Sequence, residues 1–160
     1  MLFRSLVKGG VAFEPGLYLR GAAQSAAYFA LMGLLGVALQ VLCNNKFVGY
    51  LVVILLLAWQ VVFDILHFDH NLYNIAGLPQ LPYSDMNGYG HFMTGWSWYL
   101  LYWGLFVLAL LILAQAFWVR GLSHEWRARL HLARQRLDGA PAAALALCGA
   151  SFVATGGWIF

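Results

Sequence analysis

The side chains best able to bind ligands or exchange protons lie in one polar stretch, residues 64–91, between two long apolar runs. Carboxylates, imidazoles and amides occur there together, and such groups bind metals, exchange protons near neutral pH or hydrogen-bond polar solutes. The candidate site residues are Asp64, His67, Asp69, His70, Asp85, Asn87 and His91. If this chain has a functional site of its own, we expect it here, as a gate or loop.

A metal site is one alternative for this stretch. If the preceding helix continues for two turns, Asp64, His67 and His70 follow one another at a spacing of three residues and share one helical face. Two imidazoles and a carboxylate can hold a transition metal. However, HFDH is not an established ligand spacing, and neither Cys nor Glu joins the cluster. We therefore predict no metal and no cofactor, and keep a metal or haem site using His67, His70 and His91 as an alternative.

Known catalytic motifs are missing from the sequence. It contains no GxxxxGK[ST] loop for ATP, no HExxH zinc-peptidase motif and no GxSxG nucleophile motif. We predict no catalytic residues and no enzymatic activity within these residues.

The amino-acid composition indicates the kind of structure that holds the polar stretch. Of the 160 residues, 62% are hydrophobic and only 9% are charged, and the mean hydropathy is +0.73. Soluble domains carry about 25% charged residues. These values predict an all-α, polytopic helical membrane protein. The net charge of +3 does not indicate a nucleic-acid partner, because the basic residues cluster beside an apolar run as topology signals do.

Four apolar segments are long enough to span a bilayer, which takes about 20 residues. The predicted spans are 21–43, 47–66, 98–119 and 141–160. Between the second and third lies a loop, 67–97, and between the third and fourth lies an amphipathic interfacial helix, 120–138. We treat 1–160 as a single transmembrane region.

The orientation follows from the basic residues, which favour cytoplasmic segments. Residues 120–138 contain five arginines, whereas residues 67–97 contain no Lys or Arg. We therefore place the amphipathic helix and the turn at Lys46 inside, and the loop and both ends of the chain outside. We expect the arginines of this helix to contact anionic lipid head groups.

The outer loop is rich in Gly, Pro, Asn and Asp, with aromatic residues interleaved. This mixture predicts a re-entrant-like loop near head-group level, which membranes tolerate only where protein or water covers the backbone. An aromatic belt that anchors the neighbouring spans is the alternative interpretation, with Trp96 and Trp98 as its main members.

Small residues form a face on the first and last spans, including Gly33, Gly36, Gly149 and Ala150. Such faces let helices approach closely in lipid, so both spans are expected to sit inside a larger bundle. Cys43 and Cys148 lie at or in apolar segments and are predicted to be free thiols.

The order of several segments resembles a known family. FEPGLYLRG, NNKFVGY, HFDHNLYNIAGLPQLPYSDMNGYGHF, YWGLFVLALLILAQAFWVRG, RARLHLARQRL and GGWIF follow one another as in the membrane part of bacterial ABC-type permeases fused to a zinc aminopeptidase. The likeness covers nearly the whole chain, and YSDMNGYGHF is its most specific block.

The resemblance implies a type 2 ABC exporter permease, with a re-entrant element outside and transport driven by a separate ATP-binding subunit. It also implies that these residues are a fragment of a larger permease in the bacterial cytoplasmic membrane. Expected partners are the lipid bilayer, further permease helices or a second copy, and the ATPase. A membrane anchor for an extracytoplasmic aminopeptidase is the third alternative, although no residue matches the peptidase's own positions.

Overall fold

The computed structural model describes residues 15–66, 74–79, 81, 89–90, 92–118 and 126–159. Regular structure within these ranges is helical throughout, in α2 (Pro15–Cys43), α3 (Lys46–Ile65), α4 (Phe92–Phe117), α5 (Trp126–Arg136) and α6 (Ala140–Ile159). Four of these helices, α2, α3, α4 and α6, are long and apolar enough to cross a membrane. The chain is therefore an all-α, polytopic helical membrane protein, as the composition predicts.

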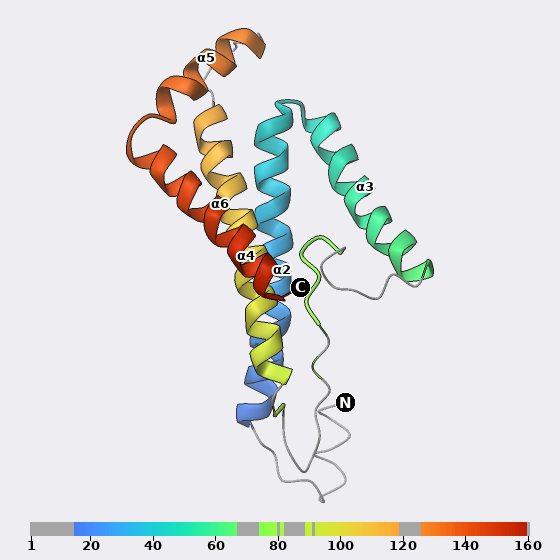
Figure 1. The fold of residues 1–160 in the computed structure, drawn as a ribbon. Coiled ribbons are helices and arrows are strands. Elements are labelled where there is room, and N and C mark those ends of the chain that lie inside the picture. Colours follow the sequence, from blue (N-terminus) through green and yellow to red (C-terminus); the bar gives the residue numbers. More distant parts are fainter. Residues whose placement is uncertain are drawn as a thin grey trace, which may run out of the picture.

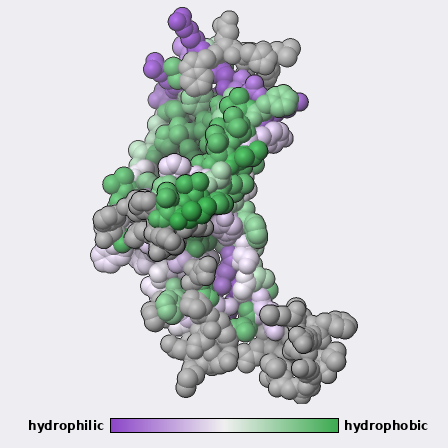
Figure 2. Space-filling view, turned by 90° about the vertical axis from the view of Figure 1, so that its right-hand side faces the viewer, coloured by the Kyte–Doolittle hydropathy of each residue, from purple (hydrophilic) through white to green (hydrophobic). Residues whose placement is uncertain are grey.

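Helix α4 is the centre of the bundle. It packs against α2 on one side and α6 on another, and α5 lies against its carboxyl end. Figure 1 shows α6 crossing α4 obliquely and α3 leaning away from α2. In Figure 2 hydrophobic side chains cover the middle of the molecule, and hydrophilic ones gather at the end that carries α5. This distribution matches a bundle whose middle lies in hydrocarbon.

The helices match the predicted spans most closely at their carboxyl ends. Helices α2 and α4 begin six residues earlier than predicted, at Pro15 and Phe92. The loop between the second and third spans therefore ends before Phe92, and residues 92–97 belong to α4. With 29 residues, α2 is about 43 Å long at 1.5 Å per residue, which exceeds the ~30 Å of hydrocarbon. Its first turns thus reach the interface or the helix tilts.

The turn between α2 and α3 is made by two asparagines. Asn44 has a φ of 53°, the left-handed conformation that Asn tolerates at the end of a helix. Asn45 caps α3, because its Oδ1 accepts a hydrogen bond from the Phe47 N–H at 3.0 Å. A Cβ at Gly49 would lie only 3.2 Å from the Cα of Gln40. Glycine thus permits the close approach of α2 and α3 beside their turn.

Aromatic side chains join α6 to α4. The Tyr102 ring of α4 stacks on Phe152 of α6, with ring centroids 4.3 Å apart. The same ring covers Gly156, where an added Cβ would approach to 3.0 Å. Gly33 and Gly149, by contrast, have open space beside them. The predicted small-residue faces are therefore used only in part by the helices of this chain. The prediction of free thiols is confirmed for Cys43 and Cys148.

Candidate functional site

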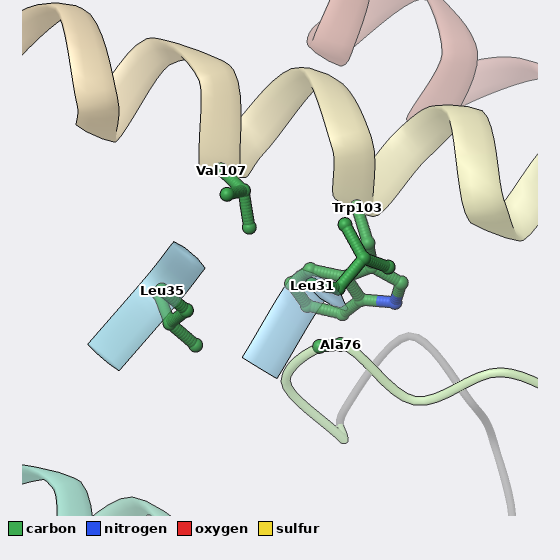
Figure 3. Close-up of a cluster of buried hydrophobic side chains, with 5 residues drawn as sticks. All are labelled: Leu31, Leu35, Ala76, Trp103 and Val107. Carbon is green, nitrogen blue, oxygen red and sulfur yellow. The ribbon is translucent and has the colours of Figure 1, made fainter. Parts of the chain in front are cut away.

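Residues 74–79 form an irregular segment that packs between α3 and the α2–α4 pair. Ala76 is fully buried and packs in one cluster with Leu31 and Leu35 of α2 and Trp103 and Val107 of α4 (Figure 3). These four side chains lie near the midpoints of α2 and α4. The segment therefore reaches the middle of α2 and α4, and its later residues run toward the end of the bundle opposite α5 (Figure 1).

Two hydrogen bonds hold the backbone of this segment. The Gln60 Nε2 of α3 donates a hydrogen bond to the Ile75 carbonyl at 2.6 Å, and the Gly77 N–H bonds to the Asn74 carbonyl at 2.7 Å. Exposed irregular backbone does not persist in hydrocarbon, because each unpaired group costs several kcal/mol. The bond from Gln60 and the contacts of Ala76 with α2 and α4 hold the segment against these helices.

Ala76 has an unusual backbone conformation. Its φ is 57°, in the left-handed region that costs a residue with a Cβ roughly 1–2 kcal/mol. Such conformations persist where the surroundings determine them, and they occur often at functional sites. Here the burial of the Ala76 methyl group against Leu31 and Trp103 offsets the cost.

A cavity of about 310 Å³ lies beside this segment. Gln24 and Tyr28 of α2, Leu78 and Pro79 of the segment, and Trp96 of α4 contribute to its walls. The Gln24 Nε2 is buried and has no hydrogen-bond partner among the described residues. An amide donor left without a partner within a span favours a site that water or a polar solute enters.

The candidate residues named from the sequence cannot be compared with this arrangement. Asp64 belongs to the last turn of α3, but its side chain is outside what the structure describes. The other six are outside the described residues altogether: His67, Asp69, His70, Asp85, Asn87 and His91. Within the described ranges no three His, Cys, Asp or Glu residues lie close enough to hold a metal.

At the opposite end of the bundle, one arginine joins three helices. Arg129 of α5 is only 3% exposed, and its Nη2 donates to the carbonyl oxygens of Val41 and Phe117, both at 3.0 Å. Val41 lies in the last turn of α2 and Phe117 ends α4. Carbonyls at helix carboxyl ends lack helical partners and carry the negative end of the dipole, so a cation stabilises them.

A second arginine strengthens the attachment of α5 to α4. The Arg136 Nη1 donates to the carbonyl of Trp118 and, at 3.5 Å, to that of Ala116. The expectation that the arginines of this helix face lipid head groups is therefore wrong for Arg129, which protein covers. Backbone carbonyls at the ends of two spans provide a nearer acceptor than lipid phosphate does.

Three residues important here were not singled out from the sequence, namely Gln24, Gln60 and Arg129. The two glutamines carry a recognisable signal, because an amide within an apolar span must find a partner. Arg129 carries none, since its role depends on where α2 and α4 end in space.

No family model, curated protein or solved structure matches the chain. What the site does must therefore be inferred from its own residues and their geometry.

Proposed function

We propose that the chain is a membrane-spanning permease segment of an ABC-type exporter, in the bacterial cytoplasmic membrane, with transport driven by a separate ATP-binding subunit. The observation that carries the proposal is the irregular segment 74–79, whose buried Ala76 packs against the middle of α2 and α4. Static membrane bundles are built from continuous helices, and irregular backbone at depth is typical of proteins that pass a solute. The sequence resemblance described above points the same way.

The unpaired amide of Gln24 supports a solute path next to this segment. Its cavity lies between α2, α4 and the residues Leu78, Pro79 and Leu81, on the side predicted to face out. Displacing the segment would open this cavity toward the bundle centre, so segment 74–79 acts as the gate.

The open helix faces support a larger assembly. Helix α3 packs mainly against α2, and most of its side chains are exposed, including Ile54 at 60% and Val61 at 58%. A methyl group added at Gly33 or Gly149 would meet no other atom within 4 Å. Lipid covers apolar side chains well, but small residues gain from close helix contact. Further permease helices or a second copy would supply that contact.

The gating role is tested by cross-linking segment 74–79 to α3. Cysteines replacing Gln60 and Ile75, in a chain whose native cysteines are changed to alanine, are expected to form a disulfide under oxidation. In the full-length protein reconstituted with its ATPase, the locked form should lose transport-coupled ATP hydrolysis, and reduction should restore it. The two single-cysteine proteins, treated with the same oxidant, are the matched controls. Unchanged hydrolysis in the cross-linked protein would overturn the gating role.

The orientation is tested separately. A cysteine at Ser84 should react with an impermeant thiol reagent added outside cells, and one at the exposed Gln135 of α5 should not. The reverse pattern would contradict both the orientation and the exporter function.

A metal or haem protein is the second candidate, and it rests on the histidines near the outer loop. Metal analysis and an absorption spectrum of the purified chain decide between the two. A near-stoichiometric metal or haem that is lost on changing His67 and His70 to alanine would replace the permease proposal.

A further inference from the structure

A second cavity, of about 400 Å³, lies at the end of the bundle that carries α5. The turn between α2 and α3 forms one wall and the end of α4 forms the other, with Arg129 of α5 between them. Lys46, the first residue of α3, also lines it. This cavity is separate from the gate, since it lies at the opposite end of α2 and α4.

The cavity is electropositive. It contains the charges of Lys46 and Arg129, and the amino-terminal end of α3 adds a partial positive charge. None of the described residues that line it is acidic. The carboxyl ends of α2 and α4 bring about half a negative charge each to Arg129 through the carbonyls of Val41 and Phe117, so the positive charge left over comes mainly from Lys46 and the start of α3. The Nε of Arg129 is buried and has no partner among the described residues.

The walls of the cavity are amphiphilic as well as charged. Gln40, Asn44 and Asn45 offer amide donors, while Val37, Val41 and Phe117 offer apolar surface. Val37 is 49% exposed, and the apolar surface that it begins extends along α2 toward the middle of the bundle. An anionic group with an attached hydrocarbon chain fits this combination, because the anion reaches the basic residues while the chain follows α2.

We propose that this cavity binds the phosphate of an anionic phospholipid from the leaflet next to α5. The position agrees with the chemistry, since helix ends and basic residues meet at the level where head groups lie, and basic pockets between spans bind such head groups. The bound phosphate pairs with the exposed Lys46 and lies near the covered guanidinium of Arg129, so it stabilises this end of α2, α4 and α5. The proposal does not depend on the permease function.

The test measures lipid binding by the purified full chain. In nanodiscs of phosphatidylcholine, addition of phosphatidylglycerol should raise the unfolding temperature, because a ligand that binds only the folded state stabilises it. Native mass spectrometry should show one retained phosphatidylglycerol. Lys46→Gln should weaken the apparent affinity about five-fold, the expected effect of one basic residue on an anionic head group. Lys46 is exposed, so this change leaves the fold intact.

Arg134→Gln is the matched control, because Arg134 is exposed on α5 and the change removes the same charge. Its affinity for phosphatidylglycerol should stay near that of the unchanged chain. Equal weakening in both variants would overturn the site and indicate diffuse attraction to the surface. Stabilisation by inorganic phosphate alone at the same concentration would replace the lipid with a free anion. Absence of any preference for phosphatidylglycerol would leave the cavity to an acidic protein segment and refute the proposal.

Discussion

Replacing Arg129 with methionine should detach α5 from the ends of α2 and α4. Methionine is close to arginine in length and is apolar, so it keeps much of the packing but makes no hydrogen bond. Arg129 is almost fully buried, at 3% exposure, and its guanidinium lies 5.9 Å from the centre of the Phe117 ring. The variant therefore removes one charged donor from the point where three helices meet.

The magnitude follows from the contacts. Arg129 donates two hydrogen bonds to carbonyls, and bonds to charged groups contribute about 1.5–3 kcal/mol each. The two helix dipoles add about 0.3–1 kcal/mol each. Removing the guanidinium from water costs the folded state several kcal/mol, and the methionine variant is spared this desolvation cost. We expect a net loss of about 2–3 kcal/mol in the free energy of unfolding. Arg129→Lys keeps the charge but lacks the planar set of guanidinium donors, so it should lower the free energy of unfolding by about half as much.

Denaturant titration in mixed micelles measures this loss, with Arg134→Met as the control. Arg134 is exposed on the same helix, and substitutions at such positions usually change stability by less than about 0.5 kcal/mol. A cysteine at Ala133, which is 1% exposed beside Arg129, gives a local readout in a chain lacking its native cysteines. It should react slowly with a water-soluble maleimide in the parent and quickly in the Arg129 variant. If Arg129→Met and Arg134→Met give the same stability and labelling rate, the arginine does not join these helices.

Hydropathy predicts which residues cross the bilayer better than it predicts where helices begin. The apolar runs predict the carboxyl ends of α2 and α4 to within two residues, but both helices start at positions before the predicted spans. Arg20, Thr94 and Ser97 interrupt the apolar pattern without ending the helix, because a helix continues into the interface where water meets its polar side chains. Sequence hydropathy reports membrane depth, and helix ends require capping signals as well.

Helix α5 shows a second limit. The apolar spacing of Leu130, Ala133 and Leu137 predicts that these residues turn toward the membrane or the bundle. Ala133 is indeed buried, but so is Arg129, while Leu130 and Leu137 are only half-buried. The apolar pattern cannot reveal this, because the partners of Arg129 are backbone carbonyls, which every sequence contains. Likewise, the polar loop indicates a re-entrant segment, yet only the structure identifies Ala76 as its deepest residue.

Two further variants test what holds the helices and the segment together. Gly49→Ala should lower the free energy of unfolding by about 1–2 kcal/mol, because the added methyl group would press on the Gln40 backbone. Gly33 has open space beside it, so Gly33→Ala should leave the free energy of unfolding of the isolated chain unchanged or raise it by up to about 1 kcal/mol. Gln60→Leu should release segment 74–79 from α3, since it removes the bond to a buried carbonyl and leaves that group unpaired at a cost of about 1–3 kcal/mol. A cysteine at Leu78 reports the release by faster labelling, with Gln115→Leu, which changes an exposed glutamine of α4, as the control. Because the segment is held by both this bond and the Ala76 contacts, Gln60→Leu should loosen it without unfolding the bundle. Unaltered labelling at Leu78 would mean that apolar packing alone keeps the segment in place.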